Sequence, residues 1–177
     1  MISLTHVFWF FVFFFALVGA MRGWAKELLV SFSVILAIFI LTVMFRYVDF
    51  FQNLLTTTGP GAAFWLRAII LMVMAFFGYQ TPSIPRLAQK AVRERLQDVL
   101  LGIFLGALNG IMIVGSLWFY LDQADYPFEF VIAPDLSTPA GQAAKDLVNL
   151  MLPNWLGVPY IYFAVMIAFA FVMIVFV

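Results

Sequence analysis

Few side chains in this sequence could carry out chemistry. The chain has a single histidine, His6, and no cysteine, which excludes a multi-histidine metal site or a cysteine nucleophile supplied by this chain alone. Neutral imidazole is a good axial ligand, so His6 is the candidate ligand for a haem or a bacteriochlorophyll. Because no second ligand or polar support accompanies it, we expect it to face solvent or lipid head groups. We predict no catalytic residue and no metal site, and therefore no enzyme.

An arginine and a glutamate lie close together in a short glycine motif. The motif reads Gly19-x-x-Arg22-Gly23-x-x-x-Glu27 and separates two apolar stretches. Gly23 permits a tight turn, and Glu27 would lie in the first turn of the next helix, where the helix dipole favours an anion. Arg22 could reach a lipid phosphate or pair with Glu27 across the turn. We expect a structural role, because charges at the membrane interface are much less costly than charges at its centre.

Glycines four residues apart mark a second motif. Gly102, Gly106 and Gly110 repeat at this spacing, with Asn109 beside them and Gly115 further along. Such glycines leave a groove on one helix face that lets a neighbouring backbone approach closely, which is how helices pack in lipid. We therefore interpret this segment as the central packing helix rather than as a substrate path.

A basic amphipathic segment occupies residues 80–98. Its apolar residues recur at helical spacing with charged residues between them, and the basic positions are Arg86, Lys90, Arg93 and Arg95. We expect a helix on the membrane surface that is attracted to anionic lipids. A dedicated site for a partner protein is the alternative.

The composition indicates that these residues belong to a membrane protein. Hydrophobic residues make up 66% of the 177 residues and charged residues only 10%, which lies outside the range of water-soluble domains. The net charge of zero argues against binding to nucleic acid. The sequence predicts an all-α integral membrane protein with about five transmembrane helices. The predicted spans are residues 2–21, 28–45, 64–79, 99–121 and 158–177.

These spans divide the chain into three parts. Residues 1–121 form a four-helix core, residues 122–157 an acidic outer connection with a short interfacial helix at 138–152, and residues 158–177 a C-terminal span. Six of the nine Lys and Arg residues fall in the first and third connections, and three fall on the other side. Because basic loops stay in the cytoplasm, we predict a multi-pass protein with its N-terminus outside and its C-terminus in the cytoplasm.

The two glycine motifs resemble signatures of the CvpA family, the colicin V production proteins of bacterial inner membranes. The stretch ALVGAMRGWAKELL is similar to that family's first-helix pattern, and LLGIFLGALNGIMIVG is similar to its fourth-helix glycine pattern. The resemblance covers about residues 5–121. It implies a multi-span inner-membrane protein needed for toxin production or export and for envelope homeostasis, without an established catalytic activity. The acidic connection and the fifth span depart from the usual four-span pattern.

Two functions are compatible with these expectations. The first is a non-catalytic CvpA-like protein that supports toxin production, export or envelope function. The second is an accessory subunit of a larger photosynthetic or respiratory membrane complex. The expected partners are membrane lipids and other membrane protein subunits. We predict no cofactor of its own, although lipids, pigments or quinone tails could contact the chain in such a complex.

Overall fold

The computed structural model describes residues 3–80 and 95–176, which form helices joined by turns and irregular segments, without a strand. The helices are α1 (Leu4–Arg22), α2 (Trp24–Tyr47), α3 (Asp49–Thr57), α4 (Pro60–Tyr79), α6 (Arg95–Gln123), α7 (Pro139–Asn149), α8 (Leu152–Trp155) and α9 (Tyr160–Phe176).

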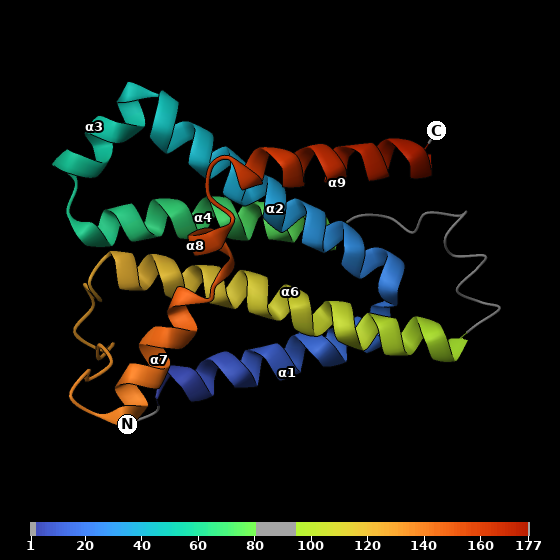
Figure 1. Ribbon diagram of the computed structural model, residues 1–177, viewed down its shortest axis with the longest axis horizontal. Helices are drawn as coiled ribbons and strands as arrows, with labels where there is room; N and C mark the ends of the chain where they lie inside the picture. The colour runs from blue at the N-terminus through green and yellow to red at the C-terminus, as the bar shows by residue number, and fades with distance from the viewer. Residues whose placement is uncertain (1–2, 81–94, 177) are drawn as a thin grey trace.

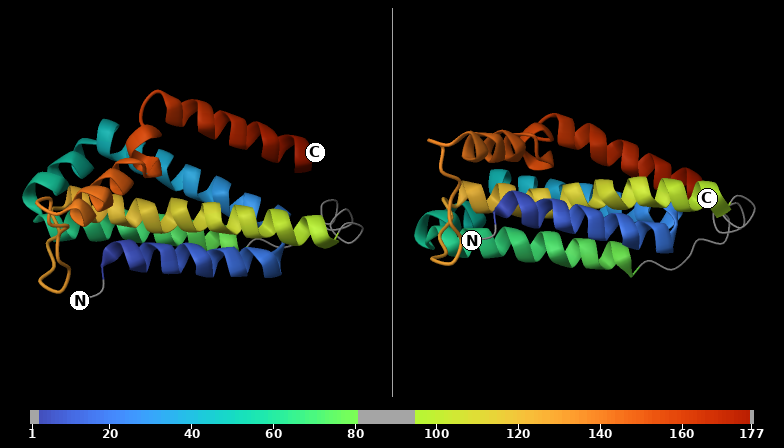
Figure 2. Two further views of the ribbon diagram at one scale, coloured as in Figure 1. Left: turned by 60° about the horizontal axis from the view of Figure 1, so that its bottom comes forward. Right: turned by 90° about the horizontal axis from the view of Figure 1, so that it is seen from below.

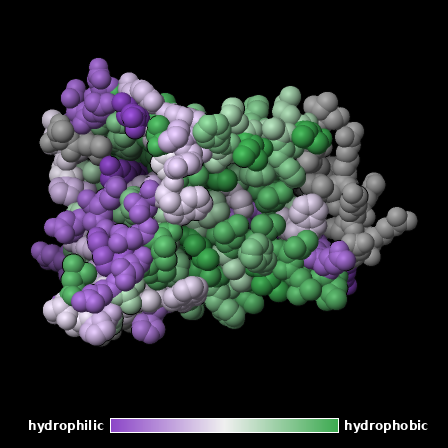
Figure 3. Space-filling model, viewed as in Figure 1, coloured by the Kyte–Doolittle hydropathy of each residue, from purple (hydrophilic) through white to green (hydrophobic). Residues whose placement is uncertain are grey.

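Four of these helices, α1, α2, α4 and α6, are long and apolar enough to cross a membrane. They contain 19, 24, 20 and 29 residues, and a helix rises 1.5 Å per residue against a hydrocarbon core of about 30 Å. Hydrophilic residues gather at one end of the molecule, and hydrophobic residues cover much of the rest of the visible face (Figure 3). The chain is an all-α integral membrane protein, as the composition predicted.

The four long helices form one bundle in which each runs antiparallel to the next (Figures 1 and 2). α1 lies along α6, while α2 packs on both α4 and α6. We call one end of the bundle the Gly23 end, because it holds the turn between α1 and α2, together with the last residues of α4 and the first turn of α6. The opposite end, the α3 end, holds the start of α1, the whole of α3 and the last turn of α6.

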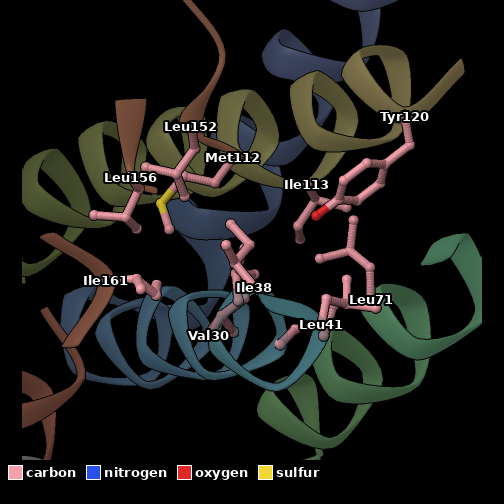
Figure 4. Packing of buried hydrophobic residues seen from close by; sticks show 13 residues of the cluster. Val30, Ile38, Leu41, Leu71, Met112, Ile113, Tyr120, Leu152, Leu156 and Ile161 are labelled. Atoms are coloured by element: carbon pink, nitrogen blue, oxygen red, sulfur yellow. The ribbon is translucent and has the colours of Figure 1, made fainter. Parts of the chain in front are cut away.

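The apolar core lies between α2, α4 and α6 (Figure 4). Val30 and Val34 of α2 and Leu71 of α4 are completely buried, and Met112 and Ile113 of α6 pack against them. Buried side chains of this kind each make many close contacts whose dispersion energy adds up. The packing fixes α2 against α6, which is the pair of helices that carries most of the buried polar groups described below.

The connection after α6 folds back onto the bundle instead of staying at the surface. Ala144, Val148 and Met151, in and just after α7, are buried against Phe8 of α1 and Trp118 of α6. The helix predicted at 138–152 is present as α7 but ends at Asn149, and a separate short helix, α8, follows. Leu152 and Leu156 then enter the central core, so the part of this connection from α7 onward packs against the bundle.

An ion pair and a hydrogen-bonded tyrosine attach this connection to the last turn of α6. Lys145 Nζ lies 2.7 Å from a carboxylate oxygen of Asp122, and the Tyr126 hydroxyl donates to the same carboxylate at 3.3 Å. Trp118 Nε1 donates to the Tyr126 oxygen at 3.2 Å. Burial is the main cause that raises the pKa of Tyr126 to about 12, so this hydroxyl keeps its proton at neutral pH and remains a donor to Asp122.

The segment predicted as a fifth span forms α9, an apolar helix of 17 residues, which is not among the four helices of the described residues that are long enough to cross a membrane. It packs on α2, where the rings of Phe32 and Phe171 lie 5.3 Å apart and the hydroxyls of Tyr47 and Tyr162 are 2.8 Å apart. The helix is shorter than the roughly 20 residues of a full span. The chain reaches α9 from α8, which lies on one face of the bundle partway along its length, and α9 runs from there toward the Gly23 end (Figures 1 and 2).

Candidate functional site

The carboxylate of Glu27 is the centre of a polar network inside the bundle. Glu27 is completely buried. Its Oε1 accepts a hydrogen bond from Arg22 Nη1 at 2.8 Å, and its Oε2 accepts one from Asn109 Nδ2, also at 2.8 Å. The Tyr79 hydroxyl donates a longer bond of 3.4 Å to Oε2. Both oxygens are therefore satisfied, as a buried carboxylate requires.

Asn109 is the second centre, and it too is completely buried. Its Nδ2 also donates to the backbone carbonyl of Glu27 at 2.9 Å. Its Oδ1 accepts a bond of 2.7 Å from the Ser31 hydroxyl, one helical turn further along α2. A single amide in the middle of α6 thus bonds to two successive turns of α2.

Arg22 extends the network to two more helices. It is the last residue of α1, and its Nη2 donates to the backbone carbonyl of Tyr79, the last residue of α4, at 2.8 Å. The guanidinium also lies over the Tyr79 ring, 4.4 Å from its centroid, in a cation–π contact. Positive charge at the end of α4 is favourable because the helix dipole is negative there. Four helices consequently meet at one ion pair.

The glycines permit the close approach of helices that this network requires. A Cβ atom on Gly19 of α1 would overlap the carbonyl oxygen of Gly102 and would lie 2.8 Å from the Cα of Gly106. One on Gly106 would lie 2.9 Å from the Cα of Gly19, and one on Gly110 would lie 3.0 Å from the Cα of Val12. The backbones of α1 and α6 are in direct contact along this face.

The turn between α1 and α2 is held by a glycine and an aspartate. Gly23 has φ +83°, a left-handed conformation that favours glycine. Asp98 of α6 accepts a 3.1 Å bond from the backbone N–H of Trp24, one of the free N–H groups at the start of α2. A Cβ on Gly23 would lie 2.6 Å from the Asp98 carboxylate. Gly23 therefore serves both the turn and the contact with α6.

The structure brings together residues from both sequence motifs. The predicted ion pair between Arg22 and Glu27 forms, and Gly102, Gly106 and Gly110 face α1. Glu27 lies in the first turn of α2, as predicted, but its side chain has no exposed surface, so it faces the inside of the bundle and not water or lipid head groups. Gly115 has a different neighbour from the other three glycines, since its Cα faces the Met151 side chain.

Sequence reasoning missed the link from Asn109 and Ser31 to Glu27. Asn109 and Glu27 are 82 residues apart in the chain, so their pairing depends on how the helices are arranged. One signal was available: Asn109 stands directly beside Gly110 and three residues after Gly106, on the helix predicted to pack most closely. Tyr79 was likewise not singled out.

The other candidate residues lie apart from this network. His6 is exposed in the first turns of α1, at the α3 end. Within the described ranges, no group of three or more His, Asp and Glu side chains could hold a metal ion. Arg95 begins α6 and is exposed. The other basic residues of the amphipathic segment, Arg86, Lys90 and Arg93, lie outside the described residues, as does the helix predicted there.

Comparisons with models of protein families, with curated proteins and with solved structures find no match for this chain. The donors and acceptors of the network around Glu27 are directed at one another, between α1, α2, α4 and α6, and they hold these helices in register.

Proposed function

We propose that this protein is a non-catalytic, CvpA-like integral membrane protein that supports toxin production or export, or envelope function. One observation carries the proposal: the two segments that resemble the CvpA family are in contact. Gly19 of the first segment touches Gly102 and Gly106 of the second, and Glu27 is bonded to Asn109. The residues that carry the resemblance thus form one packed unit, which supports the view that they are a common structural core.

The saturated network supports a role without catalysis. General acid–base chemistry needs a side chain within hydrogen-bond reach of a substrate, and a transporter usually places ionisable groups along a path at mid-membrane depth. The Glu27 carboxylate instead has donors from Arg22, Asn109 and Tyr79 on its two oxygens. Its bonds to the protein would have to break before it could serve a substrate.

The proposal includes a bacterial inner membrane and an N-terminus outside the cell, and single cysteines test this orientation because the native chain has none. Ser137, just before α7, and Gln97, in the first turn of α6, are both exposed. We expect a membrane-impermeant maleimide to label Ser137→Cys in intact cells and Gln97→Cys only after permeabilisation. Labelling of Gln97→Cys in intact cells, with Ser137→Cys protected, would contradict the orientation.

An accessory subunit of a larger membrane complex is the second candidate, and the exposed face of α9 favours it. Beyond the side that packs on α2, this helix exposes large apolar side chains: Phe163, Met166, Ile167, Phe169, Met173 and Ile174. Either lipid or a neighbouring subunit can cover such a surface. A helix added to a four-helix core in this way offers a docking surface within the membrane.

Extraction in a mild detergent, followed by native electrophoresis and mass spectrometry, separates the two functions. For the CvpA-like function we expect the chain to migrate alone or as a small homo-oligomer, because the buried network around Glu27 is satisfied within one chain. Co-migration with a large complex in a fixed stoichiometry would contradict this and would favour the accessory subunit. Deletion of residues 158–177 should then release the chain from the complex.

A further inference from the structure

In the part of the chain that the structure describes, one arginine inside a membrane-spanning helix has no acidic partner. Arg67 lies seven residues after Pro60, where α4 begins, which places it about 10 Å along the helix from the α3 end. Its side chain is half-buried. The guanidinium carbon lies 5.1 Å from the centroid of the Phe45 ring and 5.7 Å from that of Tyr120. Two aromatic rings thus hold the cation in place.

The N–H groups of Arg67 are free within the part of the chain that the structure describes. There it forms no ion pair and donates no hydrogen bond, whereas Arg22 uses two of its nitrogens for Glu27 and Tyr79. A guanidinium has five N–H donors in a planar fork that matches the oxygens of phosphate or carboxylate. Charged groups within a membrane normally pair with one another or with backbone carbonyls. The free N–H donors of Arg67 therefore indicate that an anion from outside the chain binds here.

A cavity of about 420 Å³ opens beside Arg67 between the start of α4 and the end of α6. It lies at the α3 end, where hydrophilic residues gather (Figure 3). Besides Arg67, the side-chain amide of Gln123 can serve as a donor. The lining residues are Thr57, Thr58, Gly59, Pro60, Ala63, Arg67, Gln123 and Ala124.

The start of α4 adds a favourable electrostatic field to this cavity. Gly59 and Pro60 line it, and the helix has no side-chain cap there. The N-terminus of a helix carries partial positive charge that stabilises anions. Two acids flank the lining residues Gln123 and Ala124 in the sequence. Asp122 is bound by Lys145, and Asp125 is exposed. Arg67, Gln123 and the helix terminus therefore offer donors and positive potential to the same space.

We propose that this cavity binds a phosphate group, held by the guanidinium fork of Arg67 with Gln123 as a second donor. Phosphate could come from a lipid head group or from a soluble ion, and both would present the same oxygens. The depth of Arg67 along α4 and the opening at the α3 end suit either source. The Phe45 and Tyr120 rings hold the guanidinium carbon at 5.1 and 5.7 Å from their centroids, so the cation stays beside the cavity that Arg67 lines.

The test measures binding to the full chain in a maltoside detergent, with inorganic phosphate and short-chain phosphatidylglycerol as separate probes. Short-chain phosphatidylcholine, whose phosphate has its own cation, is the reference lipid. We expect saturable protection against thermal unfolding, followed by tryptophan fluorescence. Protection by phosphatidylglycerol alone identifies a lipid site, protection by phosphate alone identifies a site for a soluble ion, and protection by both identifies a site open to either.

Variants test whether Arg67 is responsible for this binding. We expect Arg67→Gln to weaken the binding of the effective probe at least tenfold, a change on the order of 1.4 kcal/mol, and Gln123→Ala to weaken it less. Arg46→Gln is the matched control, because Arg46 is an exposed arginine at the same end of the bundle. Unchanged binding by Arg67→Gln, or no protection of the wild-type chain by either anionic probe, would overturn the proposal. If Arg67→Gln does not fold, Arg67→Lys keeps the charge, loses the fork and should still bind more weakly.

Discussion

The Gly19→Ala variant is expected to separate α1 from α6 and to lose about 3 kcal/mol or more of stability. A Cβ on Gly19 would overlap the carbonyl oxygen of Gly102 and approach the Cα of Gly106 to 2.8 Å. Both obstacles are backbone atoms, so no side chain can rotate away. Overpacked cores lose typically 1–3 kcal/mol and occasionally more. This loss must also exceed the gain of about 1 kcal/mol that alanine brings to a helix relative to glycine.

Unfolding by SDS in mixed micelles, followed by tryptophan fluorescence, measures this loss. Gly157→Ala is the control, since a Cβ there would meet no atom within 4 Å, and we expect its transition to match the wild type. Gly110→Ala should fall between the two, because its Cβ would lie 3.0 Å from the Phe15 side chain and from Val12. If Gly19→Ala unfolds at the same SDS fraction as Gly157→Ala, the contact between α1 and α6 is not as close as described.

The main architecture could be predicted because each long helix is a local property of the sequence. A run of about 20 apolar residues has to satisfy its backbone within itself in lipid, which only a helix does. The third span was predicted to begin at residue 64, whereas α4 already begins at Pro60, since proline is favoured at the first helical position. The all-α class and the positions of the four long spans follow from these rules alone.

The short elements could not be predicted in the same way. α3 has only 9 residues and carries no uninterrupted apolar run, so the segment between the second and third spans read as a plain connection. α8 has 4 residues, of which only Leu152 is buried, and this burial depends on the central core that Leu152 enters. Their positions are set by contacts with distant helices, which periodicity within a segment does not encode.

The sequence predicted the local contacts of the candidate site but not those between helices that are distant in the sequence. Arg22 and Glu27 are five residues apart, so a tight turn at Gly23 brings them together whatever the rest of the fold does. The bond between Glu27 and Asn109 requires the register of α2 on α6, which the buried core side chains between these two helices fix. The burial of Glu27 could not be predicted from its neighbours in the sequence. A carboxylate inside the bundle is tolerable only with a donor such as Asn109, which lies on a helix far away in the sequence.

The Arg22→Met variant is expected to destabilise the bundle by about 3–5 kcal/mol, the range for removing one partner of a buried ion pair. Glu27 would remain completely buried, with Asn109 and the longer bond from Tyr79 as its remaining side-chain donors. Lys145→Met removes the cation of an ion pair in which the lysine side chain is 40% exposed. As the control, it should change stability by less than about 1 kcal/mol. The same SDS titration compares the two.

The Glu27→Met variant should lose less than Arg22→Met, although it breaks the same ion pair, with an expected loss of about 1–3 kcal/mol. The Arg22 side chain is 19% exposed, so its charge can reach water or lipid head groups, and it keeps the carbonyl and the ring of Tyr79. Asn109 keeps the backbone carbonyl of Glu27 and the hydroxyl of Ser31. The charge left behind is therefore better solvated in this variant.

The double variant, Arg22→Met with Glu27→Met, distinguishes a coupled ion pair from two independent contacts. Two apolar side chains of similar length leave no unpaired charge, and such replacements of a buried pair are often close to neutral. We expect the double variant to be more stable than Arg22→Met alone, with a coupling energy between the sites of at least about 1 kcal/mol. If the two single losses simply add, Glu27 is held by Asn109 and not by Arg22, and α2 is anchored by α6 rather than by the turn at Gly23.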